Sequence, residues 1–462
     1  MTSSSSSSSG NHSAPSVPLK HQEKSNSPKT PSTCIRNTCI FFLLLLLTFY
    51  LLLGHFMYHA MFSLSDKFYT EGYLKSRENS IFGVQTYINC SDWRNATMSH
   101  KFLKGLTEKM ITMKNSIEIS NVSFTSRETE DVPYRVNLNG RLYRIKSSSS
   151  SSSSTEVTSA TTTKKVIIFV HGFRMRQNHY TITIPLQMML NAFPNGEYDF
   201  FTFELRNHGQ SEKEYPSVLL SDKSYSTYGS LEYADLLGAI DHVKSQYGYE
   251  HVGLYGLSKG GATIMTAYLK STPHNKDSIR AMFLDSPACD IEFTLQSNLY
   301  RVLGYIVGHD DRLELDSMRM KIARYVLWPA IQLFGSVVAK PNHPHHSYPP
   351  FLNDAFRLWN KRVELESSRS GNDESGTQVL VHKVAIHFDH PKSDILVPMQ
   401  NSERCSALAS KLDHLKVSTY YGDVNSKELK HTFSDCKDHC ILMLSEPEKY
   451  YQRMTTFFKE NL

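Results

Sequence analysis

A serine framed by two glycines stands between an apolar run and a stretch with helical spacing. The five residues are Gly256-Leu257-Ser258-Lys259-Gly260, and the run HVGLY precedes them. A serine hydroxyl is a weak nucleophile at neutral pH and needs a base beside it. A sharp strand-to-helix turn exposes such a hydroxyl above a sheet and leaves no room for side chains at the flanking positions. We therefore predict that Ser258 is a nucleophile on a strained turn.

In chains with a nucleophile turn of this kind, the acid follows the nucleophile in the sequence and the base follows the acid. Asp394 follows the apolar run KVAIHFDHP, where a loop can aim its carboxylate at an imidazole. His439 lies in a late loop before the last helical stretch. Asp285 and Asp389 compete for the acid, and His431 competes for the base. We predict a triad of Ser258, His439 and Asp394 on chain order and loop position.

Negative charge that develops on a carbonyl oxygen needs backbone N–H donors. One donor is the N–H of Lys259, which opens the helix after the nucleophile. The other is the N–H of Phe173, in the turn after the run KKVIIFV, which His171 and Gly172 hold open. We expect these two N–H groups to form an oxyanion hole.

Short apolar runs alternate with helical spacing over most of the chain, and this pattern predicts a parallel sheet covered on both faces. Buried strands are expected at KKVIIFVHGF, YDFFTFELRNHG, HVGLYGLS, AMFLDSP, KVAIHFDHP and LKVSTYYG. Helices are expected at SLEYADLLGAIDHVKSQYG, with Gly248 as its C-cap, at GATIMTAYLK and at PEKYYQRMTTFFKENL. The dipeptide Asn139-Gly140 within YRVNLNGRLYRI predicts a β-hairpin with a type I′ turn.

These motifs together resemble the α/β-hydrolase superfamily, and most closely its serine aminopeptidase and esterase-like branch. The motifs are FVHGF, FELRNHGQS, STYGSLEYADLLGAIDHV, LYGLSKGGAT, FLDSPACD, SDILVP and HCILMLSEPEKY. The similarity covers residues 130–290 and 380–462. It implies an α/β-hydrolase fold, Ser258 as nucleophile, Asp394 as acid, His439 as base, and no cofactor. Two positions depart from the usual pattern: Glu204 replaces an aspartate in a turn motif, and Lys259 replaces Met or Gln.

A long insertion, residues 290–380, separates two predicted core strands. The stretches LYRVLGYIVG and MKIARYVLWPAIQLFGSVVA within it are apolar and helical in spacing. The superfamily resemblance implies a cap over the active site, and a structural subdomain is the alternative. An apolar cap near a membrane suits lipid or acyl substrates.

A nearly uncharged apolar run from Cys39, of the length that crosses a bilayer, predicts a transmembrane signal-anchor helix at residues 39–60. A cleaved signal peptide is the alternative, but the run is long and its leader is nearly 40 residues. Lys and Arg dominate the N-terminal flank, so we predict a type II protein with a cytosolic tail, residues 1–38. The body then lies in the lumen of the endoplasmic reticulum or secretory pathway, or outside the cell.

Three glycosylation sequons, at Asn89, Asn95 and Asn121, follow the span and agree with this orientation. Five cysteines would be lumenal, an odd number whose pairing the sequence leaves open, and a disulfide from Cys436 or Cys440 is expected to stiffen the histidine loop. The five are Cys90, Cys289, Cys405, Cys436 and Cys440. A histidine cluster at residues 343–346 lacks the spaced pairs of a structural zinc site, so no metal is predicted.

Composition excludes other classes. The 462 residues carry a formal net charge of only +5 and no basic stripe with aromatics, so nucleic acid is not an expected partner. Ser-rich segments at residues 2–9, 147–163 and 366–377 cannot bury a core. We divide the chain into a disordered tail (1–38), the span (39–60), a lumenal stem (61–125) and an α/β-hydrolase domain (126–462).

The combined prediction is a membrane-anchored serine hydrolase that cleaves an ester, thioester or amide, with a lipid or acyl ester favoured. One alternative is a catalytically inactive binding protein on a hydrolase scaffold, although that protein would be free to lose the triad. The other is an acyltransferase that uses the same residues. The acyl group, the leaving group and the oligomeric state cannot be read from the sequence.

Overall fold

The structure is a computed structural model that describes ten segments of the chain. They are residues 31–62, 81–82, 97–146, 164–213, 226–272, 276–307, 313–334, 355–369, 383–423 and 439–462. The chain divides into two compact units, Met1–Tyr50 and Leu51–Leu462.

Helix α1 (Pro31–Phe62) begins in the first unit and contains the predicted span. Its segment Asn37–Tyr58 is long and apolar enough to cross a membrane, and only 6% of its most apolar window is buried. The large side chains from Ile40 to Leu47 are all exposed. By length and composition, this helix fits the membrane segment expected at residues 39–60.

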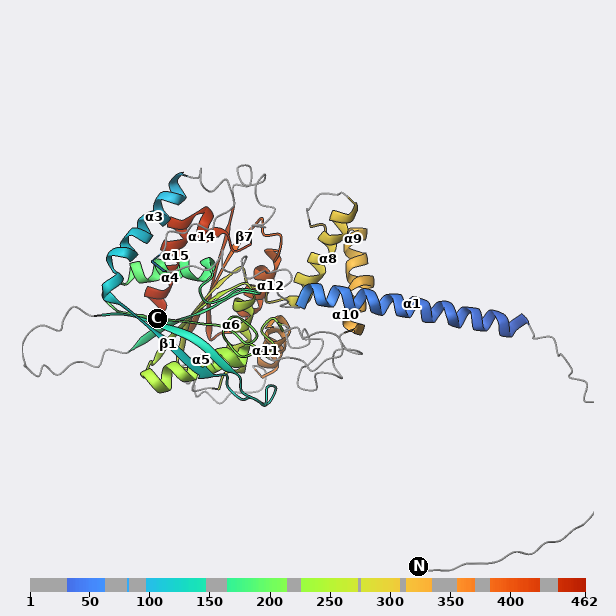
Figure 1. Ribbon diagram of the computed structural model, residues 1–462, viewed down its shortest axis with the longest axis horizontal. Helices are drawn as coiled ribbons and strands as arrows, with labels where there is room; N and C mark the ends of the chain where they lie inside the picture. The colour runs from blue at the N-terminus through green and yellow to red at the C-terminus, as the bar shows by residue number, and fades with distance from the viewer. Residues whose placement is uncertain are drawn as a thin grey trace, which may run out of the picture. The chain divides into compact units, whose positions relative to one another are not determined.

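The second unit is built on one mixed sheet of eight strands, in the order β1-β2-β4-β3-β5-β6-β7-β8 (Figure 1). The strands β3 to β8 run parallel to one another, whereas β2 pairs antiparallel with both β1 and β4. The bounds are β1 (Ile117–Thr125), β2 (Asn137–Ile145), β3 (Lys165–Val170), β4 (Asp199–Phe203), β5 (His251–Leu257), β6 (Ile279–Asp285), β7 (Val384–Pro391) and β8 (Leu415–Gly422).

The parallel strands are apolar along most of their length because helices cover both faces of the sheet. One face packs against α3 (Thr97–Thr112), which ends in the 3-10 turn η1 (Lys114–Ser116), and against α4 (Tyr180–Ala192), α14 (Leu442–Ser445) and α15 (Pro447–Asn461). The other packs against α5 (Tyr233–Tyr247), α6 (Lys259–Lys270), α11 (Ala355–Arg369) and α12 (Gln400–Ala409). All six predicted parallel strands are confirmed, and the sheet is the doubly covered one expected.

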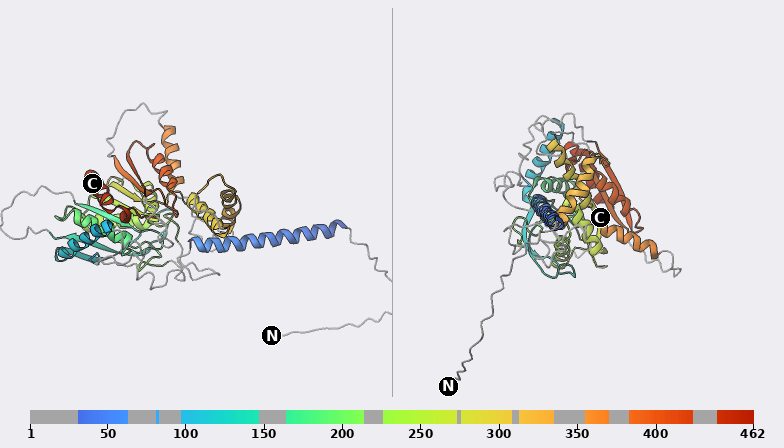
Figure 2. Two further views of the ribbon diagram at one scale, coloured as in Figure 1. Left: turned by 90° about the horizontal axis from the view of Figure 1, so that it is seen from above. Right: turned by 90° about the vertical axis from the view of Figure 1, so that its right-hand side faces the viewer.

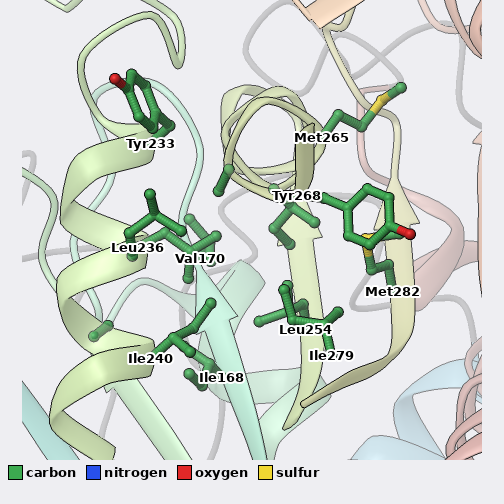
Figure 3. Close-up of a cluster of buried hydrophobic side chains, with 14 of the residues drawn as sticks. Ile168, Val170, Tyr233, Leu236, Ile240, Leu254, Met265, Tyr268, Ile279 and Met282 are labelled. Carbon is green, nitrogen blue, oxygen red and sulfur yellow. The ribbon is translucent and has the colours of Figure 1, made fainter. Parts of the chain in front are cut away.

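Figure 3 shows how the second layer closes on the sheet. Ile168 and Val170 of β3 project toward Leu236 and Ile240 of α5, and all four side chains are fully buried. Burial of each such side chain stabilises the fold by about 2 kcal/mol. Helix α5 ends where expected, because Gly248 takes the left-handed conformation with φ 69° and caps it.

The predicted hairpin at Asn139-Gly140 is wrong, because both residues lie inside the continuous strand β2. Gly140 allows β2 to lie close to β4 and does not form a turn. A Cβ on it would come within 2.8 Å of the Phe201 ring and 2.9 Å of the Thr202 carbonyl oxygen on β4. The sheet also includes β1, and α3 packs on it, although both lie in the segment that the sequence analysis assigns to a polar stem.

Between β6 and β7, the insertion folds into helices, as expected. They are α8 (Ile291–Val307), α9 (Met318–Ile322), the π-helical turn η2 (Ala323–Leu327), α10 (Trp328–Phe334) and α11. The first four share an apolar cluster that includes Leu299, Trp328 and Ile331. Tyr58, near the end of α1, belongs to the same cluster. The last turns of α1, residues 51–62, thus lie against the cap helices (Figure 2).

Candidate active site

Ser258 lies on the turn between β5 and α6, as expected for a nucleophile turn. Its backbone has φ 55° and ψ −117°, outside the regions that a serine normally occupies. The Ser258 N–H donates to the carbonyl oxygen of Asp285 at 2.8 Å, which ties the turn to the end of β6. Ser258 occupies the N-cap position of α6, where the helix dipole favours negative charge.

The two flanking glycines are required by close packing. A Cβ on Gly256 would lie 2.8 Å from the carbonyl oxygen of Gly260. A Cβ on Gly260 would collide with the carbonyl oxygen of Val170, at the end of β3. Any larger residue at either position would push α6 away from the sheet and move Ser258 with it.

Asp394 and His439 lie in direct contact. The Nδ1 of His439 is 2.6 Å from Oδ2 of Asp394, so the imidazole N–H donates to the carboxylate. Asp394 follows β7 and is buried, whereas His439 lies after β8 with about a tenth of its side chain exposed. The two predicted partners therefore meet at the carboxyl edge of the sheet.

Asp394 accepts further hydrogen bonds that hold it as an anion. Its Oδ1 accepts from the N–H groups of Leu396 and Val397, each at 2.9 Å, and His390 Nε2 lies 3.2 Å from Oδ2. Burial raises the pKa of Asp394, but His439 and the hydrogen bonds from His390 and His439 outweigh it and bring the pKa to about 2. The carboxylate is therefore ionised at neutral pH.

Ser258 and His439 lie at the same edge of the sheet, since the parallel strands β5 to β8 all end there. Asp285 lies at this edge too: its backbone carbonyl accepts from the Ser258 N–H, and burial raises the pKa of its carboxyl, a shift that Tyr450, Ser286 and His439 oppose. The structure has no hydrogen bond between the described residues Ser258 and His439. A nucleophile and its base often come into contact only in the complex with substrate, so the missing hydrogen bond does not remove His439 as the candidate base.

The competing acids have other partners. Asp285 accepts from the Tyr450 hydroxyl at 2.7 Å and from Ser286 Oγ at 2.9 Å. Asp389 lies 3.1 Å from Arg453. Neither carboxylate has a hydrogen bond with His439, so the geometry favours Asp394. The competing base, His431, lies outside the described residues.

The predicted oxyanion donors are Phe173 and Lys259, at the ends of β3 and β5. In the described part of the chain, neither backbone N–H has an intramolecular acceptor. His171 fixes the first turn, because its Nε2 accepts from Leu205 N–H at 3.1 Å while Nδ1 donates to the Gly172 carbonyl at 2.8 Å. This ring is neutral, since burial and the charge of Lys259 lower the pKa of His171 to about 3.

The side chain of Lys259 points away from solvent into a buried polar cluster. Its Nζ lies 3.6 Å from Glu232 Oε1 and 3.3 Å from His208 Nε2. Burial lowers the pKa of Lys259, and Glu232 opposes that shift. The lysine charge is therefore compensated inside the protein.

Glu232 was not predicted, although it organises the loop in front of α5. Its carboxylate accepts from Ser226 Oγ at 2.8 Å, from Thr227 N–H at 3.0 Å and from Gly229 N–H at 2.9 Å. In this loop the Tyr228 ring stacks on Phe173 with ring centres 4.9 Å apart. Glu232 occupies the N-cap position of α5, where a smaller residue is usual. A glutamate directly before a predicted helix was therefore the sign in the sequence that this residue has a special role.

Backbone strain concentrates at this edge of the sheet. Ser258 and Ser286 directly follow β5 and β6, and both have positive φ. All such non-glycine residues in the described segments are Arg174, Asn207, Tyr228, Ser258, Ser286 and Cys440. Each costs about 1–3 kcal/mol, and such residues are typical of functional sites.

Cys289 and Cys405 form a disulfide that joins the start of the cap insertion to α12. Cys440 is a buried free thiol beside His439, so of the two alternatives for a disulfide in the histidine loop the one from Cys440 is wrong, and the one from Cys436 lies outside the described residues. Cys90 and Cys436 lie outside the described residues, as do Asn89, Asn95 and the histidine cluster at 343–346. Asn121 is exposed on β1. A groove of about 440 Å³ lies elsewhere, at the start of β7 and β8, and is lined partly by Ala385, Lys416 and Asn461.

Comparisons with known proteins agree with this architecture. A family model described as alpha/beta hydrolase fold matches residues 165–328. No curated protein matches the sequence. Among solved structures, an esterase from Pyrococcus furiosus is 16% identical with a TM-score of 0.42, covering 75% of this chain and 92% of its own.

Two further esterase structures are similar to a comparable extent. Est1E from Butyrivibrio proteoclasticus, with ferulic acid bound, is 15% identical with a TM-score of 0.34 and covers 70% of this chain and 96% of its own. An esterase from Exiguobacterium antarcticum is 13% identical with a TM-score of 0.35, and the alignment covers 72% and 99%. The family match and the sheet order confirm the expected fold class.

Proposed function

We propose that the chain, which has the α/β-hydrolase fold and matches that fold's family model over residues 165–328, is a membrane-anchored serine hydrolase. It cleaves an ester, thioester or amide, with a lipid or acyl ester favoured. Ser258 is the nucleophile, His439 the base and Asp394 the acid. The observation that carries the proposal is the hydrogen bond from His439 to an ionised Asp394, at the edge where Ser258 stands on its strained turn.

The reaction follows from these positions. His439 Nε2 takes the proton of the Ser258 hydroxyl as the oxygen attacks the substrate carbonyl, and the imidazolium is stabilised by Asp394. The tetrahedral oxyanion accepts hydrogen bonds from the N–H groups of Phe173 and Lys259. His439 then gives its proton to the leaving group. Water, activated by the same imidazole, releases the acyl group and restores the serine.

The anchor and the orientation have separate support. The segment Asn37–Tyr58 has the length and hydropathy of a bilayer span. Disulfides persist in oxidising compartments, so the bond between Cys289 and Cys405 supports a lumenal or extracellular body. Asn121 stands exposed on β1, as a glycosylated residue must. A type II protein with its catalytic body in the secretory pathway or outside the cell satisfies all three.

A fluorophosphonate probe tests the nucleophile directly. The full-length protein should label, and the Ser258→Ala variant should not. An unlabelled wild-type protein, folded by its circular dichroism, would instead favour a binding protein on a hydrolase scaffold. Esters of graded acyl length, with aminoacyl amides alongside, then identify the bond cleaved. Added alcohol acceptors would reveal acyl transfer, and carbonate extraction tests anchoring.

A further inference from the structure

The cap carries an apolar surface that its own packing leaves uncovered. Outside α1, the described residues include nine exposed large apolar side chains, and six of them lie between residues 302 and 326. These six, which we name the cap face, are Val302, Leu315, Met318, Ile322, Tyr325 and Val326. Soluble monomers rarely expose apolar side chains in such a group, so the cap face calls for a partner.

Helical spacing puts three of the six cap-face residues on one side of α9 and η2. Met318, Ile322 and Tyr325 follow one another at intervals of four and three residues, which places them on one side of a helix. Met318 is 71% exposed and Tyr325 is 68% exposed. The opposite side is also apolar, because Met320, Ala323 and Leu327 are buried in the cap core. A surface helix normally has one apolar side, so apolar residues on two opposite sides, with Arg and Lys between them, call for a second apolar environment.

The end of α1 packs against the same cap. Gly54 allows α10 to approach so closely that a Cβ on it would collide with the Ala330 carbonyl oxygen. The ring of Tyr58 lies 5.4 Å from that of Phe334. Small residues at a close helix crossing are typical of helix pairs in membranes. Leu52 and Phe56, on the other side of these turns, are 62% and 69% exposed.

The position of Gly54 in the span sets the depth of the cap. The segment Asn37–Tyr58 has 22 residues, about 33 Å of helix, which matches the hydrocarbon thickness of about 30 Å. Gly54 lies four residues before its end, about 6 Å inside that boundary. Helices that lie in a membrane interface bury their apolar side to a comparable depth of about 5–10 Å.

We infer that the cap face docks on the lipid bilayer that α1 crosses, so that an acyl substrate reaches the active site from the membrane. The inference rests on the proposed anchoring and hydrolysis. Lys321 is exposed beside the apolar residues, and Arg324 is half-buried there, as expected for a helix at a lipid surface. On the site side, the Tyr228 hydroxyl donates to the Met61 carbonyl at 3.2 Å while its ring stacks on Phe173. The membrane end of α1 therefore contacts the loop that packs on the oxyanion turn.

Depth-dependent fluorescence tests the docking on the full-length protein in nanodiscs. We would compare Tyr325→Trp with Ile111→Trp, a matched exposed apolar position on α3. Brominated phosphatidylcholine should quench the tryptophan at 325 beyond the level of the unsubstituted protein, and should leave the tryptophan at 111 unaffected. Equal quenching at both positions, or none at 325, would overturn the docking. Cross-linking between copies through position 325 would assign the cap face to a dimer and would also overturn it.

An activity comparison separates this inference from the proposed function. Met318→Glu with Tyr325→Glu should reduce hydrolysis of an ester held in the bilayer by about tenfold, because two charges must then be kept out of the interface. Hydrolysis of a short water-soluble ester should not change, and Ile111→Glu should change neither rate. If wild-type protein cleaves no ester but the tryptophan at 325 is quenched, the hydrolase proposal fails and the docking stands. The other outcome is that the soluble ester is cleaved, and that the Met318→Glu, Tyr325→Glu protein and the Ile111→Glu control both hydrolyse the bilayer substrate as fast as the wild type. In that case the docking fails and the hydrolase proposal stands.

Discussion

The Nδ1 of His439 lies 2.6 Å from Oδ2 of Asp394, across 45 residues of sequence that include all of β8. This contact orients the imidazole, because an ionised carboxylate can only accept and the Nδ1 that faces it must therefore carry a proton. In the neutral ring Nε2 is then the acceptor, which is the tautomer that a general base requires. The same carboxylate is itself fixed by two backbone N–H groups of its own loop.

We expect Asp394→Asn to lower kcat by about 10⁴-fold, because an amide at this position favours the wrong imidazole tautomer. Binding should change much less than turnover, so KM should stay close to the wild-type value. Steady-state kinetics on a soluble ester measures both. Asp423→Asn is the matched control, since its carboxylate is 80% exposed after β8 and pairs only with Lys392 among the described residues. A full loss in the control, or wild-type turnover in Asp394→Asn, would remove Asp394 from the mechanism.

The buried pair of Lys259 and Glu232 predicts a non-additive effect on stability. Lys259→Met leaves the Glu232 carboxylate buried without its cation, which we expect to cost about 3 kcal/mol of unfolding free energy. Adding Glu232→Gln removes the unpaired charge, so the double variant should be destabilised by less than the sum of the two single variants. Urea unfolding of the wild type, the two single variants and the double variant gives the coupling free energy between Lys259 and Glu232. Strict additivity would mean that the two charges do not interact.

The free energy of unfolding should decrease as the pH is lowered below 6.5, which is well above the range where carboxylates titrate. The pKa of His171 drops from its ordinary 6.5 to about 3 in the fold, because of burial and the charge of Lys259. A lowered folded pKa means that the unfolded chain binds the proton first, so the stabilisation is complete above pH 6.5 and is lost as pH falls toward 3. Asp394, with its pKa lowered from 3.8 to about 2, acts only below pH 4.

A His171→Gln variant isolates this contribution. Between pH 6 and pH 5 it should lose less unfolding free energy than the wild type, by about 1.4 kcal/mol. The amide can still accept from Leu205 N–H, so the variant keeps the hydrogen bond that fixes the turn. Urea titrations at the two pH values measure the difference. Parallel pH profiles for the two proteins would show that His171 titrates normally in the fold.

The sequence predicts the buried strands well and the edges of the fold less well. Strands such as β5 and β6 are apolar throughout because both faces are covered, and that signal is local. Strand β1 is an edge strand with many exposed polar residues, so its sequence resembles that of a polar stem. The sequence around Gly140 predicts a turn because the contact that requires this glycine is with β4, about sixty residues away.

The candidate site divides in the same way. Ser258, Asp394 and His439 stand out because each follows a recognisable strand in a fixed order. Glu232 and His390 act through contacts that exist only after the chain folds, Glu232 on the Lys259 charge and His390 on Asp394. The packing of the end of α1 on α10 is of the same kind, since a single glycine in an apolar run gives no sign of its partner.

The disulfide should stabilise the cap and the acid loop together. Cys289 and Cys405 enclose 116 residues of sequence separation, including the cap and Asp394. Closing a loop of that size is expected to contribute about 4 kcal/mol by limiting the unfolded chain. Dithiothreitol should therefore lower the denaturation midpoint of the wild type. The double variant Cys289→Ala with Cys405→Ala should start lower and be unaffected by the reductant. An equal response in both proteins would trace the effect to other cysteines.

The last prediction concerns the side of the membrane on which the body lies. Asn121 and Ser123 of the sequon are two residues apart on β1, so both face solvent while Val122 is buried. A glycan on Asn121 would project outward and leave the sheet intact. If the body is lumenal, Asn121→Gln should remove one increment of the mobility shift caused by endoglycosidase treatment. Asn11→Gln, in the sequon Asn11-His-Ser of the tail that is predicted to be cytosolic, should remove none. A glycan found on Asn11 would invert the orientation, because oligosaccharyl transfer reaches only lumenal segments, and the active site would then face the cytosol.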